Sequence, residues 1–112
     1  MTRIKIDHDI SFSEYDTKYI IDWSQKIPYP ISAIYIRRST GGNTHVCVDI
    51  PLSLSPLDEL LIRAIMHDDA RRIRGDLERY LLDSKIFGLL FDEKYYPLTR
   101  VLKKAGKWIK IK

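Results

Sequence analysis

Apolar and polar side chains alternate in three stretches of the chain, residues 2–7, 31–38 and 44–50. Each stretch places aliphatic side chains at every second position, which is typical of a strand with one buried face and one exposed face. Residues 41–43, Gly-Gly-Asn, separate the second stretch from the third and form a strong turn signal. The pattern predicts three β-strands and an antiparallel β-hairpin that joins the last two.

Between the first two strands, apolar residues recur with helical spacing from residue 15 to residue 27. Ser11 or Ser13 can cap the start of this helix, because a serine side chain accepts a hydrogen bond from a free amide of the first turn. Pro28 and Pro30 end it, since proline cannot continue a helix. The spacing predicts one amphipathic helix here.

A second helical region follows the hairpin, over residues 57–81. Ser55 stands before a proline and predicts the start of the helix. The phase of the apolar positions slips near His67, which indicates either one kinked helix or two helices. In the second case Asp68 or Asp69 caps the second helix.

The rest of the chain carries three weaker signals. An apolar run over residues 86–91 predicts a fourth strand that ends at Asp92, residues 97–104 favour a short helix, and residues 107–112 favour a last strand of open placement. The order strand–helix–strand–strand–helix–strand is typical of a ferredoxin-like, RRM-like α+β sandwich. In that fold the first strand lies between the third and the fourth, and the helices cover one face of the sheet.

Length and composition favour a single domain over residues 1–112, with a ferredoxin-like core at 1–96 and a basic tail at 97–112. No apolar run is long enough to span a membrane, and Cys47 is the only cysteine, so an intracellular (cytoplasmic) location is the simplest interpretation. Asn and Gln occur once each, which indicates a heat-adapted source, although chance in a short chain gives the same result.

Alternation also predicts which side chains lie on the sheet face away from the helices. Ionisable groups are frequent there, and Asp9 lies just beyond the end of the first strand. Any sheet covered on one side has a polar face, so this pattern is compatible with no function at all. The predicted members of the face are Arg3, Lys5, Asp7, Tyr35, Arg37, His45, Cys47, Asp49 and Asp92.

Three short motifs on these strands resemble those of the archaeo-eukaryotic primase superfamily. They are Asp7-His8-Asp9 after a strand, the Gly-rich turn and His-aliphatic pair of residues 39–46, and Asp92 after an apolar strand. The chain is much shorter than a complete primase, so the resemblance fits either a minimal catalytic core or a degenerate relative that binds without catalysis.

The resemblance implies a chemistry for these residues. It implies an RRM-like catalytic sheet on which Asp7, Asp9 and Asp92 hold Mg²⁺ or Mn²⁺ and His45 contacts nucleotide phosphates. Hard divalent cations prefer carboxylate oxygens, and two of them can stabilise both oxygens of a phosphoryl transfer. Against this stand plainer interpretations, in which the aspartates only end strands and begin turns, and the histidine is an ordinary exposed strand residue.

The formal net charge of +4 permits contact with phosphates. The clearest basic feature is the tail, which carries lysines around Trp108 and no acidic residue after Glu93. Arginines and acids of the second helical region are spaced to pair with each other and favour a solvated face. The predicted phosphate contacts are Arg37, Ser39, Gly41, Gly42, Lys103, Lys104, Lys107 and Lys110.

These observations lead to one hypothesis and two alternatives. The hypothesis is a small nucleic-acid-processing protein, of the kind that viruses or mobile elements carry, with metal-dependent nucleotidyl transfer on a primase-like palm. The alternatives are a non-catalytic domain that binds DNA or RNA, with Tyr35 and Arg37 stacking on bases, and a structural protein that forms a homodimer.

Overall fold

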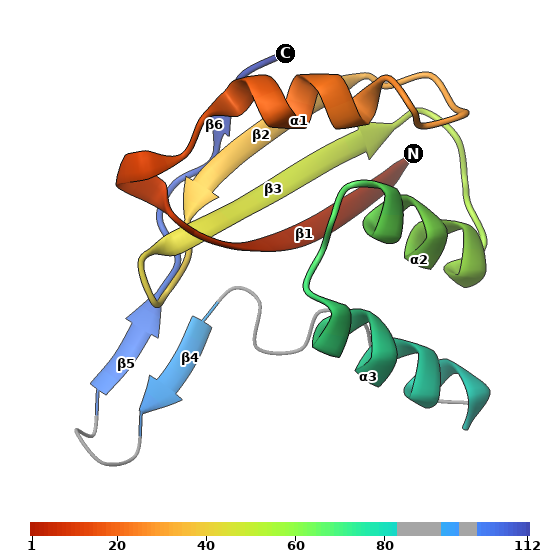
Figure 1. The fold of residues 1–112 in the computed structure, drawn as a ribbon. Coiled ribbons are helices and arrows are strands. Elements are labelled where there is room, and N and C mark those ends of the chain that lie inside the picture. The colour runs from red at the N-terminus through yellow and green to blue at the C-terminus, as the bar shows by residue number, and fades with distance from the viewer. Residues whose placement is uncertain (83–92, 97–100) are drawn as a thin grey trace.

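The computed structural model describes residues 1–82, 93–96 and 101–112. Figure 1 shows the path of the chain through its strands and helices. The elements are β1 (Thr2–Ser11), a short 3-10 helix (Phe12–Glu14), α1 (Thr17–Ser24), β2 (Ala33–Arg38), β3 (Asn43–Ile50), α2 (Pro56–Ile65), α3 (Ala70–Leu81), β4 (Glu93–Tyr96), β5 (Val101–Lys104) and β6 (Ile109–Lys110).

Four of these strands form an antiparallel sheet in the order β1-β3-β2-β6. The predicted hairpin is confirmed, because β2 pairs with β3 from Ala33 opposite Asp49 to Arg38 opposite Thr44. Gly42 has φ of 91° in the turn, a conformation that favours glycine. This α+β architecture is compatible with the predicted ferredoxin-like fold.

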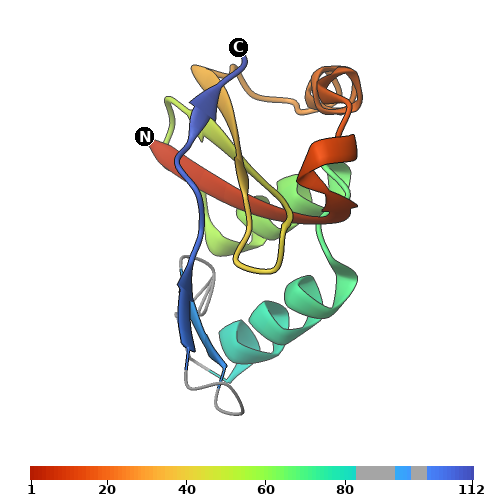
Figure 2. The ribbon, with the colours of Figure 1, turned by 90° about the vertical axis from the view of Figure 1, so that its left-hand side faces the viewer.

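The core lies between the sheet and the helices α1 and α2, which Figure 2 shows on the same side of the sheet. The predicted parity is confirmed for the three long strands, whose aliphatic side chains are buried on the helix side. A fully buried isoleucine contributes about 1.5–3 kcal/mol to stability, so this isoleucine-rich layer holds the fold together. Its members include Ile4, Ile6, Ile20, Ile34, Ile36, Val46, Val48, Ile62 and Met66.

The helix boundaries correct one prediction and settle another. Neither predicted serine caps α1; Asp16 does, since its carboxylate accepts a hydrogen bond from the amide of Lys18 at 2.9 Å. The phase slip separates two helices, α2 and α3, and Asp69 caps the second through the amide of Arg71. The cap at Ser55 is confirmed by its bond from the amide of Asp58.

The C-terminal predictions have mixed outcomes. The prediction of a helix over residues 97–104 is wrong for residues 101–104, which form β5 and pair with β4. Residues 97–100 lie outside the described residues. The last strand is confirmed over Ile109–Lys110, and it joins the sheet beside β2. The strand predicted at residues 86–91 lies outside the described residues. The predicted pairing of that strand with β1 therefore stays a prediction. No helix in the described part of the chain is long and apolar enough to cross a membrane.

Candidate nucleic-acid interface

The sheet face away from the helices is closed at its centre, contrary to the prediction of an open polar face. His45 is only 4% exposed and Cys47 1% exposed, so β3 is buried on both sides. The C-terminal segment explains part of this burial, because the ring of Trp108 lies 4.2 Å from the guanidinium of Arg37 on this face. The expectation of an exposed histidine is therefore wrong.

Charged groups on this face are paired across neighbouring strands. Arg3 lies opposite Asp49 in the ladder and donates two hydrogen bonds to its carboxylate, at 2.8 and 2.9 Å. These bonds hold the pKa of Asp49 below its ordinary value. Arg37 Nε donates to Nδ1 of His45 at 3.1 Å. Because Nδ1 accepts, a neutral His45 carries its proton on Nε2.

That Nε2 atom faces the first aspartate of the D-x-D motif. Asp7 lies opposite His45 in the ladder, and its Oδ1 is 3.9 Å from Nε2. Burial raises the pKa of Asp7, Arg72 opposes the rise, and nearby carboxylates add to it. The backbone amide of Asp7 donates to the carboxylate of Asp68 at 2.7 Å, which fixes the middle of β1 against the link between α2 and α3.

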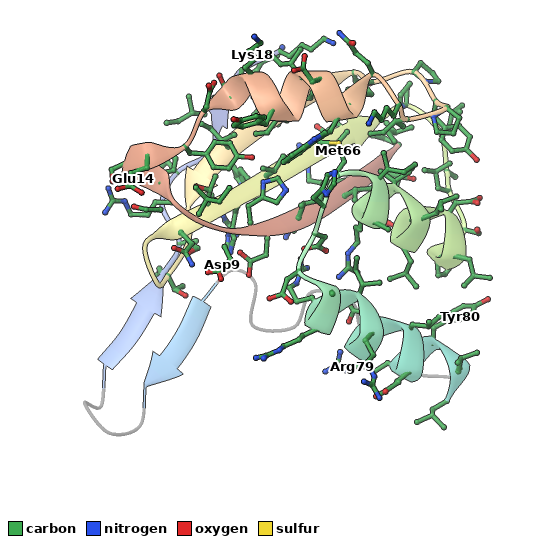
Figure 3. All side chains as sticks on the ribbon, in the orientation of Figure 1. Asp9, Glu14, Lys18, Met66, Arg79 and Tyr80 are labelled. Atoms are coloured by element: carbon green, nitrogen blue, oxygen red, sulfur yellow. The ribbon has the colours of Figure 1, made fainter. Side chains whose placement is uncertain are left out.

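The second aspartate of the motif, also in β1, bonds instead to the first residue of β3, beside the hairpin turn. Asp9 accepts a hydrogen bond from Nδ2 of Asn43 at 2.8 Å. Figure 3 shows Asp9 at the end of β1 near this turn. Within residues 1–82 and the described parts of the tail, no three His, Cys, Asp or Glu side chains are placed to hold a metal ion together. Asp92, the third predicted ligand, lies outside the described residues.

A hollow of about 470 Å³ opens at the Gly-rich turn. Hydrogen bonds shape it: the amide of Gly42 donates to Ser39 at 3.1 Å, and the amide of Gly106 donates to Arg38 at 2.8 Å, which brings the tail against the turn. A Cβ added to Gly41 or Gly42 would meet nothing within 4 Å, so the space beside the turn is open. The lining residues are Arg38, Ser39, Thr40, Gly41, Gly42, Lys104 and Gly106.

This hollow brings together four of the predicted phosphate contacts, Ser39, Gly41, Gly42 and Lys104. Sequence reasoning missed Arg38, although its place directly before the turn was the available signal. Among the other predicted contacts, Arg37 is buried beneath Trp108, and Lys107 and Lys110 are exposed along the tail. The side chain of Lys103 lies outside the described residues.

A second, smaller hollow of about 110 Å³ lies on the sheet face. Tyr35, Cys47, Arg3 and Trp108 line it. Burial raises the pKa of Cys47 to about 12, so the thiol is uncharged at neutral pH. The hollow therefore has aromatic walls, a neutral thiol and a cation that is already paired with a carboxylate.

The arginine-rich helical region is self-paired, as its spacing predicted, but only part of it is solvated. The predicted pair of Arg72 with Asp68 forms at 2.7 Å, but Asp68 is buried. Arg63 is also buried, and it donates to Asp68 at 2.6 Å and to Asp76 at 2.7 Å. These bonds join α2 to α3, so this cluster is structural. The pair of Arg74 with Glu78 remains exposed, as predicted.

Comparisons of the chain with protein-family models, with curated proteins and with solved structures give no match. The fold and the site define a class only: an α+β domain with a four-stranded antiparallel sheet, a hairpin turn beside the cations Arg38 and Lys104, and an aromatic residue of the tail on the sheet face.

Proposed function

We propose that the protein binds nucleic acid through its phosphates, with the hollow at the Gly-rich turn as the central contact. The lining of the hollow carries this proposal. Arg38 and Lys104 supply two cations, Ser39 and Thr40 supply two hydroxyl groups, and the glycines leave space for a ligand. Among the residues whose side chains the structure describes, which leaves out those of 83–103, no acid lines the hollow, so these cations attract a phosphate.

The tail favours a polyanion over a small isolated anion. Beyond Lys104 the chain passes the turn at Gly106 and continues beside β2, carrying the exposed lysines Lys107 and Lys110. A row of cations that begins at this hollow matches the repeated charge of a nucleic-acid backbone. The net charge of +4 adds a weak long-range attraction.

The test is the salt dependence of oligonucleotide binding in the double variant Arg38→Ala, Lys104→Ala. Each lost phosphate contact on a single strand lowers the slope of log K against log salt by about 0.7, so the double variant should lose about 1.4 from the slope. Fluorescence anisotropy with a labelled oligonucleotide measures both the affinity and the slope.

The matched control is the double variant Lys18→Ala, Lys26→Ala. Both lysines are exposed, one in α1 and one just after it, and α1 lies on the other side of the sheet. Their removal changes the net charge by the same amount. We expect the control to keep the slope of the unchanged protein. Equal slopes in the two double variants would show that the hollow does not contact the phosphates of the nucleic acid.

A second candidate function is metal-dependent nucleotidyl transfer at the neighbouring aspartates. The observation that favours it is the position of Asp7 beside His45, at 3.9 Å, with Asp9 at the same end of the hairpin as the hollow. A nucleotide phosphate in the hollow would then lie near two carboxylates that can hold Mg²⁺ or Mn²⁺. Asp92 completes the set in this proposal.

A further inference from the structure

The smaller hollow on the sheet face, called the slot below, has the volume and the lining chemistry to hold one flat ring. Tyr35 lies opposite Cys47 in the ladder, and Lys110 of the tail lies opposite Tyr35 on its other side. This register places Trp108 and Tyr35 as the aromatic members of the lining, with the buried thiol of Cys47 among them.

The arginine of the slot is held in place. Arg3 donates two hydrogen bonds to Asp49, and its guanidinium lies 5.8 Å from the centre of the Tyr35 ring. Because the Asp49 carboxylate compensates its charge, the guanidinium of Arg3 contributes to the slot mainly as a planar surface on which a ring can stack. Aromatic rings beside a planar guanidinium are the surfaces on which unpaired bases stack.

We propose that this slot accepts one unpaired nucleobase, so that the protein prefers single-stranded nucleic acid to a duplex. The inference rests on the proposed phosphate-binding function and adds the class of nucleic acid. A hollow of about 110 Å³ takes one ring system, and a base that is stacked and paired in a duplex does not reach it.

The two hollows lie along the same pair of segments. On β2, Arg38 lines the phosphate hollow and Tyr35 the slot; they are three residues apart, ~10 Å of strand, and alternation turns their side chains to opposite faces of the sheet, so it is the tail that runs past both hollows. On the tail, Gly106 lines the phosphate hollow, and Trp108, two residues later, lines the slot. One single strand can therefore place a phosphate at the turn and a base of the same or the next nucleotide in the slot.

The experiment compares an oligothymidylate of about 12 nucleotides, a typical single-strand site size, with an abasic sugar-phosphate oligomer of the same length. Trp23→Phe leaves Trp108 as the one fluorescent tryptophan, because the chain has two. We expect the oligothymidylate to quench Trp108 and to bind more tightly than both the abasic oligomer and a duplex of equal length.

Variants of the slot then separate stacking from phosphate binding. Trp108→Ala should weaken oligothymidylate binding roughly 5- to 150-fold and leave abasic binding unchanged. Tyr35→Leu keeps the bulk of the side chain without the ring and should act in the same direction, while Trp108→Phe keeps a ring and should retain most of the affinity. Melting curves identify any variant that is unfolded. The binding of the remaining folded variants is then compared with that of the unchanged protein.

Equal affinity for the base-containing and abasic oligomers would overturn the slot and leave the phosphate contacts standing. A duplex that binds as tightly as the single strand would also overturn it. If neither oligomer binds, the proposed function itself fails. The two proposals are thus distinguished by the abasic oligomer, which contains phosphates and no bases.

Discussion

The imidazole of His8 donates a hydrogen bond from Nε2 to the backbone carbonyl of Met66 at 2.6 Å, which ties β1 to the end of α2. A carbonyl can only accept, so neutral His8 leaves Nδ1 to accept from the hydroxyl of Tyr15. The edge of Trp23 packs against the same imidazole. His8 is 3% exposed, and these buried contacts join β1 to α1 and, 58 residues along the chain, to the end of α2.

This arrangement predicts a loss of stability in mild acid. Burial lowers the pKa of His8 in the folded protein, whereas in the unfolded chain it titrates near its ordinary value of about 6.5. Below that pH the unfolded state binds more protons, so the free energy of unfolding should fall as pH drops from about 6.5 toward the folded pKa. Denaturant titrations at several pH values measure this.

The variant His8→Gln should remove that pH dependence, because glutamine can donate to Met66 but does not titrate in this range. The control is His67→Asn, which removes an exposed histidine at φ of 59°, a conformation that asparagine tolerates. An unchanged pH dependence in His8→Gln would show that His8 is not the titrating group.

The buried ion-pair cluster predicts a large cost for losing one member. In Asp68→Ala, Arg63 loses the carboxylate 2.6 Å from its Nε and keeps a buried charge with less compensation. We expect the free energy of unfolding to fall by about 3–5 kcal/mol. The exposed pair offers the contrast, since Glu78→Ala removes the partner of Arg74 and should cost under about 1 kcal/mol. Similar losses in both variants would contradict this account.

The two glycines of the turn should respond differently to alanine. Gly42 has φ of 91°, so Gly42→Ala should destabilise the fold by about 1–2 kcal/mol. Gly41 lacks a positive φ and an added Cβ there meets nothing within 4 Å, so Gly41→Ala should be nearly neutral. Thermal melting of the pair checks this, and an equal loss at both positions would mean that the turn differs from the one described.

The second candidate function predicts stabilisation by a divalent metal. If Asp7, Asp9 and Asp92 bind Mn²⁺, a hundredfold excess over the dissociation constant should stabilise the fold by ~2.7 kcal/mol. The measurement is a melting curve with and without Mn²⁺, on the unchanged protein and on Asp7→Asn, Asp9→Asn. No shift in the unchanged protein, or the same shift in the double variant, would exclude a metal site that depends on these two carboxylates.

Much of the local structure could be predicted from the sequence. Alternation located β1, β2 and β3 and the buried parity of Ile4 and Ile6, and residues 41–43 located the turn. These signals are local, because they depend on side-chain periodicity and on backbone preferences within a few residues. The cap of α1 was missed since several residues of similar capping ability stand within a few positions, and only the final path of the chain selects Asp16.

The sequence by itself also determined that the turn is made of small residues, which is why residue types and their spacing are enough to single out Ser39, Gly41 and Gly42. Only the tertiary structure decided that Gly106 bonds to Arg38, that Trp108 lies on Arg37 and that Arg63 is buried between two aspartates. The reason is physical: most of these contacts join residues that are far apart along the chain. They depend on how β6 and the helices pack against the rest of the fold. Hydrophobic periodicity shows which face of an element is buried, but it does not specify which distant element covers that face.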